Sequence, residues 1–114
     1  MKIEDLANQL NMDVLSYKEG LQKNISGGYV SDMLSDVMAN SKQGNIWITL
    51  QTHPNIVAVA LLKNLAGIII VSNRQPEEET LKKAVSEKIA ILTTSMPAFE
   101  IAGKIYQLLN KNPL

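Results

Sequence analysis

The sequence predicts an α/β fold, a single three-layer domain in which a mostly parallel sheet is built from repeated strand-turn-helix units. From residue 45 onward, short apolar runs typical of buried strands alternate with longer segments of helical character. Three prolines, at positions 54, 76 and 97, each follow an apolar run and a short polar turn, as expected for proline in the first turn of a helix. A chain of 114 residues, 46% of them apolar, is long enough to form one domain with its own core.

The elements expected before residue 45 are, in order, a helix over 3–10, a short strand at 14–15, a turn and a strand over 25–30, and a helix over 33–40. The first helix follows from apolar residues at the spacing i, i+3, i+4 and i+7. Gly27 and Gly28 indicate a turn, because a glycine pair is common there and no phosphate-binding glycine motif surrounds it. Ser31 or Asp32 is expected to cap the second helix.

The elements expected after residue 45 are strands over 46–50, 68–71 and 89–93, helices over 54–66 and 76–88, a last helix from Ser95, and a tail over 110–114. Gly67 is expected to end the first of these helices. A stripe of Phe99, Ala102, Ile105 and Leu109 predicts the buried face of the last helix.

The alternation of strands and helices also predicts how the strands pair. At this spacing, successive strands pair in parallel through right-handed crossovers. The carboxyl ends of parallel strands lie at one edge of the sheet, and open α/β sheets bind their ligands outside that edge. We therefore expect the three strand-to-helix turns after residue 45 to share one edge.

The composition excludes several classes of protein. Eleven basic and eleven acidic residues give a formal charge of zero, so no overall field favours nucleic acid or an acidic membrane surface. The absence of cysteine fits a reducing cytoplasm and removes thiolate metal sites. Acidic residues at the N-terminus argue against a signal peptide, and no apolar stretch is long enough to cross a membrane. We expect a cytoplasmic protein that binds no cofactor, nucleic acid or membrane.

Polar side chains are concentrated in two of the expected turns. The candidate ligand-binding residues are Gln51, Thr52, His53 and Asn55 in the first turn, and Ser72, Asn73 and Arg74 in the second. The free N–H groups and the dipole at the start of a helix attract anions. Arg74, the chain's single arginine, could bind a carboxylate or phosphate with its planar guanidinium group. These turns predict a regulatory or sensor module that binds a small anionic metabolite or nucleotide at the carboxyl edge.

Structural roles also account for some of these residues. Thr52 could simply cap the helix, His53 could be a solvent-facing turn residue, and Arg74 could pair with a nearby glutamate. His53, the chain's single histidine, could act as a general base, but no carboxylate or nucleophile is identifiable near it in sequence. We therefore do not expect an enzyme. Asp32 and Asp36 share a helix face at i, i+4, which helix capping explains better than a metal site.

The expected helix over 55–66 is apolar on almost every side as far as Lys63. Such a helix must be covered on more than one side. It is either central in the monomer or part of an oligomer interface, and we favour a homodimer. The alternative function is therefore a protein-interaction or oligomerisation module without a small-molecule ligand.

Two segments, GYVSDMLSDVM (28–38) and WITLQTHPNIVAVA (47–60), resemble the small stand-alone proteins of the DRTGG-domain family. That family is similar to the N-terminal domain of HPr kinase/phosphorylase and to the middle domain of long phosphotransacetylases, and it accompanies CBS domains. The resemblance covers nearly the whole chain and implies one DRTGG-like regulatory domain over residues 1–114, with an HPr kinase N-terminal-domain-like fold and a partner protein.

The family keeps an Asp-Arg pair before the helix and a Thr-Gly-Gly element after the next strand. Here the corresponding regions are Gln51-Thr52-His53 and Ser72-Asn73-Arg74. The resemblance does not imply kinase activity, because HPr kinase transfers phosphoryl groups in a separate P-loop domain and this chain contains no P-loop motif.

Overall fold

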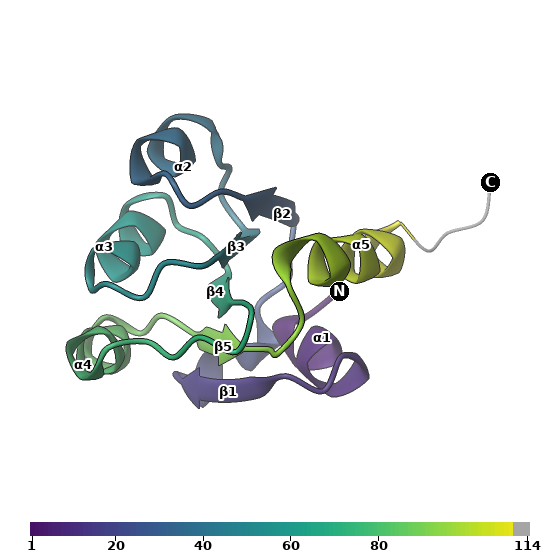
Figure 1. Cartoon of the computed structure of the whole chain (residues 1–114), viewed down its shortest axis with the longest axis horizontal. Helices are drawn as coiled ribbons and strands as arrows, with labels where there is room; N and C mark the ends of the chain where they lie inside the picture. Colours follow the sequence, from purple (N-terminus) through teal and green to yellow (C-terminus); the bar gives the residue numbers. More distant parts are fainter. Residues whose placement is uncertain (111–114) are drawn as a thin grey trace.

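A five-stranded sheet in the order β1-β5-β4-β3-β2 forms the middle layer of the molecule (Figure 1). The computed structural model describes residues 1–110. The elements are α1 (Ile3–Gln9), β1 (Asp13–Ser16), a 3-10 helix η1 (Lys18–Gln22), β2 (Gly27–Val30), α2 (Leu34–Asn40), β3 (Asn45–Thr49), α3 (Asn55–Leu62), β4 (Gly67–Ile70), α4 (Glu78–Glu87), β5 (Ile91–Thr93) and α5 (Ala98–Leu109).

The sheet is mostly parallel, as predicted. Strands β2, β3, β4 and β5 are paired in parallel, and β1 is antiparallel to β5 at one edge. Helices α2, α3 and α4 cover one face, while α1 and α5 cover the other (Figure 1). The prediction of a three-layer α/β domain is therefore confirmed. No helix within residues 1–110 has the length and apolar character needed to cross a membrane.

Helix α3 is central in its layer. Ile56, Val57, Val59 and Ala60 are buried in one cluster with residues of β3 and β4, and α3 lies between α2 and α4. The uniformly apolar sequence of α3 is therefore explained largely within the monomer, which is one of the two alternatives that its sequence left open. Its exposed apolar side chains lie at its carboxyl end.

Helix α5 covers the opposite face with a different stripe from the predicted one. Ile101 and Ile105 are buried and Leu109 packs against the core, but Phe99 is 93% exposed. At 3.6 residues per turn, Phe99 is rotated about 120° around the helix from Ile105. Placing Phe99 in the buried stripe was therefore wrong.

Three glycine and capping predictions were also wrong. Gly27 and Gly28 are the first two residues of β2 and pair with Asn45 and Ile46 of β3, so they belong to the strand and not to a turn before it. Gly67 begins β4, and Asn64, with φ of 54°, provides the left-handed conformation after α3. Ser95 does not cap α5, which has Pro97 at its N-cap.

The other helix boundaries differ by a few residues from those predicted. Helix α4 begins at Glu78, two residues after Pro76, and ends before Lys88, whose φ is 60°. Helix α2 begins at Leu34 without a side-chain cap. Residues 111–114 of the predicted tail lie outside the described residues.

Candidate functional site

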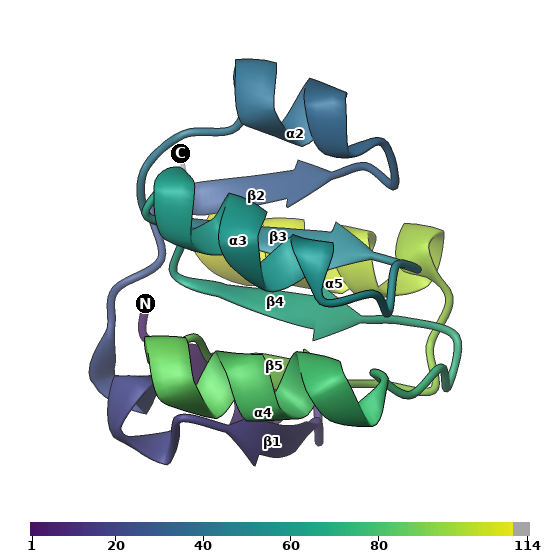
Figure 2. The same cartoon turned by 90° about the vertical axis from the view of Figure 1, so that its left-hand side faces the viewer.

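The loops that follow β2, β3, β4 and β5 share one edge of the sheet. The parallel registers place the carboxyl ends of these strands side by side, and Figure 2 shows the arrows of β2, β3 and β4 pointing to the same edge. The expectation that the strand-to-helix turns meet at one edge is confirmed. The turns after β3 and β4 are direct neighbours, because the Val71 N–H donates to the Thr49 carbonyl at 3.1 Å.

The first turn is joined to the loop after β2 by Gln51. Its side-chain Nε2 donates to the Asp32 carbonyl at 2.8 Å, and its backbone N–H donates to Thr49 Oγ1 at 3.1 Å. Gln51 is therefore partly engaged in holding two loops of the edge together. Its side chain retains a second Nε2 N–H, which could donate to an anion, and an oxygen, which could only accept.

His53 takes over part of the capping of α3. Its ring Nδ1 accepts the backbone N–H of Asn55 at 3.1 Å. This hydrogen bond requires Nδ1 to be unprotonated, so Nε2 carries the proton of the neutral ring and is its donor atom. Both His53 and Asn55 are exposed at the start of α3. The ring thus bonds to backbone at the start of α3, as a capping residue does.

Thr52 ties the first turn to the next helix. Its carbonyl accepts the hydroxyl of Thr80 at 2.6 Å and the backbone N–H of Glu77 at 3.2 Å. Thr80 is fully buried on α4. These bonds hold the start of α4 against the first turn, and they leave the Thr52 side chain partly exposed at the edge.

The second turn is held by unusual backbone conformations. Ser72 and Asn73 have φ of 58° and 59°, and their N–H groups donate to the carbonyls of Met96 and Thr94, both at 2.9 Å. Because these N–H groups are already bonded to the loop after β5, a ligand here would be bound by side chains. Ser72, Asn73 and Arg74 are all exposed. Arg74 forms no ion pair with Glu77 or Glu78, the two glutamates near it in sequence, among the described residues, and Glu78 instead pairs with Lys82 at 3.7 Å.

Asp32 is an important residue of this edge that the sequence did not reveal. One carboxylate oxygen accepts both the Thr49 hydroxyl at 2.9 Å and the Leu50 N–H at 2.7 Å. Asp32 therefore fastens the loop after β2 to the end of β3 instead of capping α2. An aspartate two positions after a strand was the available signal, but aspartate is also a usual choice for an N-cap.

Asp36 belongs to a separate cluster on α2. Its Oδ1 accepts the Tyr29 hydroxyl at 2.8 Å and the Asn40 side-chain amide at 2.9 Å. Hydrogen bonds from Asn40, Ser31 and Tyr29 lower the pKa of Asp36, while the bond to Asp36 raises the pKa of Tyr29. Asp32 and Asp36 thus have different partners. Within residues 1–110, no three His, Cys, Asp or Glu side chains are grouped closely enough to hold a metal ion.

Five of the seven candidate residues at the edge are exposed, and Gln51 and Thr52 are partly exposed. A cavity of about 700 Å³ lies elsewhere, between α5 and β2, and none of the seven candidate residues lines it. The edge offers the guanidinium of Arg74, the His53 ring and several amide and hydroxyl groups. Such an arrangement can bind an anion through several donors, but it shows no pair of acid and base groups positioned for chemistry.

Comparison with known proteins identifies both the family and the fold. The family model of the DRTGG domain matches residues 5–108. The search of curated proteins gave no match. A crystal structure from Clostridium perfringens, the CBS and DRTGG domains of the regulatory region of a pyrophosphatase complexed with its activator diadenosine tetraphosphate, superposes with a TM-score of 0.71 at 18% sequence identity.

The similarity to that structure covers 93% of this chain and 46% of the other. The chain thus spans about half the length of the pyrophosphatase regulatory region. The matched residues run through every strand and almost every helix described above. This chain belongs to the DRTGG-domain family, whose fold it shares.

Proposed function

We propose that residues 1–114 act as one cytoplasmic, non-catalytic regulatory domain that binds a small anionic metabolite or nucleotide at the carboxyl edge of its sheet. The family supports a regulatory role, because the similar pyrophosphatase region is itself regulatory and was crystallised with a nucleotide activator. Diadenosine tetraphosphate carries several phosphate charges, which is the ligand chemistry that the residues at this edge would suit.

The observation that carries the proposal is the adjacency of two donor-rich turns. His53 and Asn55 are exposed in the turn after β3, and Asn73 and Arg74 are exposed in the turn after the neighbouring β4. In the bound state we expect Arg74 to provide the charge-assisted bonds to phosphate and His53 to donate from Nε2. Thr52 and Ser72 would add hydroxyl donors, and Gln51 would position the first turn.

The distribution of backbone hydrogen bonds supports recognition by side chains. The N–H groups of Ser72, Asn73 and Asn55 already have partners within the protein. A phosphate would therefore not bind in a ring of free N–H groups, as it does in a P-loop. Removing single side chains should consequently have a large effect, since few alternative donors are available.

Isothermal calorimetry with ATP, AMP, diadenosine tetraphosphate and inorganic phosphate tests this proposal. We expect at least one of these compounds to bind, and Arg74→Ala to weaken its binding by about tenfold or more. His53→Ala should weaken it less. Lys18→Ala is the matched control, because it removes an exposed cation on η1. Since η1 follows β1, and β1 is antiparallel to β5, η1 lies at the end of the strands opposite the carboxyl edge. The proposal is wrong if none of the four compounds binds, or if Arg74→Ala and His53→Ala bind as the wild type does.

A second candidate function is a protein-interaction or oligomerisation module that forms a homodimer without ligand. The specific observation in its favour is on α5 rather than on α3, because α3 is largely covered in the monomer whereas Phe99 of α5 is almost fully exposed. We propose the homodimer as the form in which the regulatory domain works, with a further partner protein receiving its signal. Light scattering over a wide range of protein concentration tests the dimer independently of any ligand.

A further inference from the structure

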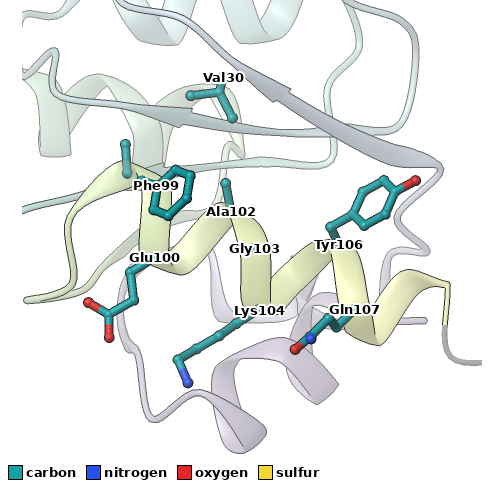
Figure 3. A pocket seen from close by; sticks show the side chains of 9 residues that line it. Val30, Phe99, Glu100, Ala102, Gly103, Lys104, Tyr106 and Gln107 are labelled. Atoms are coloured by element: carbon teal, nitrogen blue, oxygen red, sulfur yellow. The ribbon is translucent and has the colours of Figure 1, made fainter.

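A cavity at the amino ends of the strands differs in kind from the groove beside α5. Figure 3 shows that the α5 groove is lined mainly by side chains of that one helix, including Phe99 and Tyr106. The other cavity, of about 210 Å³, lies where the chain enters β2, β3 and β4, at the end of the sheet opposite the candidate ligand site (Figure 2). We call it the amino-edge cavity. Polar side chains from three loops line it above two buried apolar residues, and these six residues are Lys23, Asn24, Gln43, Asn64, Leu65 and Ala66.

Each of these three loops contains a lysine followed directly by a carboxamide residue. The pairs are Lys23-Asn24, Lys42-Gln43 and Lys63-Asn64. Strands β2, β3 and β4 are paired in parallel, so their amino ends lie side by side and the three pairs meet at one cavity. Three ammonium groups and three carboxamides therefore come from distant parts of the chain to the same place.

The three loops are held together by hydrogen bonds that do not involve the carboxamides lining the cavity. The Gly44 N–H donates to the Asn64 carbonyl at 3.0 Å, and the Ser26 N–H donates to the Gly44 carbonyl at 2.9 Å. The Ser26 hydroxyl donates to the Gln43 carbonyl at 2.8 Å and accepts the Asn45 side-chain amide at 3.2 Å. Gly44 has φ of 82°, and an added Cβ would lie 2.9 Å from Ser26 Oγ, so this close approach requires glycine. The loops are thus fixed in place, and the lining carboxamides form no side-chain hydrogen bond with another described residue.

The lysines of these loops are available to an anion. The one ion pair within residues 1–110 is on α4, so none of the three lysines is paired with a carboxylate. The Lys23 ammonium lies 5.6 Å from the centroid of the Tyr17 ring, a contact that leaves its N–H groups free to donate. Lys42 and Lys63 lie at the carboxyl ends of α2 and α3, where a cation also stabilises the helix. Helix stabilisation accounts for these two charges but not for the carboxamides that follow them.

We propose that the amino-edge cavity binds a compact oxyanion with two or more negative charges, a phosphate or a small di- or tricarboxylate. The ammonium groups provide the opposite charge, and the carboxamide NH₂ groups donate to the remaining oxygens of the anion. A volume of about 210 Å³ is below the roughly 300 Å³ at which ordinary ligand pockets begin, so the cavity is too small for a nucleotide. The amino-edge cavity therefore differs from the proposed site at the carboxyl edge both in its place and in the size of its ligand, and it does not depend on that site.

An NMR titration of the ¹⁵N-labelled full chain with sodium phosphate and with sodium citrate tests this proposal. Sodium chloride at equal ionic strength is the reference. The side-chain NH₂ groups of asparagine and glutamine are observed together with the backbone amides, so the spectra report directly on the proposed donors. We expect saturable shifts at the side-chain amides of Asn24, Gln43 and Asn64 with at least one of the two anions, with a dissociation constant on the order of 0.1–1 mM. Saturation with phosphate alone or with citrate alone would identify the class of ligand.

Two variants remove donors while keeping the local structure. Lys23→Met removes the charge but keeps a long side chain beside Tyr17, and it should weaken binding by about fivefold or more. Asn64→Gly removes a carboxamide but keeps a residue that easily adopts the φ of 54° found there, and it should weaken binding by about twofold or more. Lys83→Ala, which removes an exposed cation on α4, is the matched control and should bind as the wild type does. Circular dichroism melts verify that each variant is folded.

The outcomes distinguish this cavity from the carboxyl edge. Shifts that chloride reproduces, shifts that do not saturate with either anion, or unchanged affinity in both Lys23→Met and Asn64→Gly would overturn the proposal. Saturable shifts on residues 51–55 and 72–74 that are lost in Arg74→Ala would place the oxyanion at the carboxyl edge, and would also overturn it. Binding at the amino-edge cavity should be unchanged in Arg74→Ala, whether or not a nucleotide binds at the other edge.

Discussion

Single side chains at the carboxyl edge show how one residue type can serve two structural purposes. Asp32 follows a strand and precedes a helix, so its sequence context predicts an N-cap. In the structure its carboxylate instead bonds Thr49 and Leu50, the residues at the end of the neighbouring strand. The sequence could not distinguish these roles, because the competing partner lies 17 residues away and is brought near by strand pairing. The hydrogen bond that His53 accepts from Asn55 is local by contrast, because it spans only two residues.

Six of the seven predicted site residues lie in the two turns, Asn55 is the first residue of α3, and the local surroundings of the seven differ. Gln51 is bonded to the Asp32 loop, whereas His53, Asn55 and Arg74 are exposed. The sequence predicted the positions because strand-to-helix turns are local. It could not predict that the N–H groups of the second turn are bonded to the loop after β5, because those bonds depend on the order of the strands.

At the residue scale, the Tyr29–Asp36 contact gives a prediction about pH. The pKa of Asp36 is lowered, first by Asn40 and then by Ser31 and Tyr29. A carboxyl group whose pKa is lower in the folded state stabilises the fold above its unfolded pKa, and this stabilisation is lost as the pH falls through the folded pKa. Tyr29→Phe should therefore raise the pKa of Asp36 and reduce the loss of stability in acid.

An NMR titration of the Asp36 carboxyl group, combined with urea unfolding between neutral pH and about pH 3, measures both effects. Asn40→Ala is the comparison and should raise the pKa of Asp36 more, because Asn40 is its strongest donor. An unchanged Asp36 pKa in both variants would show that these hydrogen bonds do not hold in solution.

The order of the helices and strands along the chain could be predicted, because local sequence patterns indicate each element. The exact residues at which the elements begin and end could not be predicted. The buried strands β3 and β4 are continuous apolar runs, which is the pattern of a parallel sheet covered on both faces. The glycines were misinterpreted, because Gly27, Gly28 and Gly67 all begin strands where local rules favour turns and helix ends. The stripe on α5 was misjudged because Phe99, an apolar residue at nearly the right spacing, faces solvent.

At the element scale, two glycine-to-alanine changes should have opposite effects on stability. At Gly67, a Cβ would lie 3.1 Å from the Ala90 carbonyl oxygen and 3.4 Å from the Ile3 side chain, so backbone would have to move. Gly67→Ala should lower the free energy of unfolding by about 1–3 kcal/mol. At Gly103, in the middle of α5, an added Cβ would meet no atom within 4 Å. Gly103→Ala should therefore raise the free energy of unfolding by up to about 1 kcal/mol.

Urea unfolding at several matched protein concentrations compares the two glycine variants and reveals any contribution from self-association. Equal effects of the two substitutions would mean that the close approach of β4 to β5 at Gly67 does not constrain the fold.

For the whole molecule, the sequence predicted the fold class but not the order of the strands. Strand β1 comes first in the chain yet pairs with the last strand, β5, in the antiparallel sense, and no local signal indicates such a distant partner. The arrangement has a functional consequence. Hydrogen bonds from Ser72 to Met96 and from Asn73 to Thr94 join the candidate ligand site to the loop that leads into α5. A ligand at Arg74 would therefore bind next to the loop that leads into α5, whose Phe99 is almost fully exposed.

The central claim is that the two turns after β3 and β4 bind an anionic nucleotide or metabolite. A titration of the ¹⁵N-labelled chain with ATP and with diadenosine tetraphosphate, followed by NMR amide shifts, tests it most directly because it locates the ligand as well as detecting it. We predict that the largest shifts fall on residues 51–55 and 72–74 and are lost in Arg74→Ala. Saturable shifts confined to another surface, such as the groove beside α5, or no saturable shifts with either nucleotide, would contradict the claim.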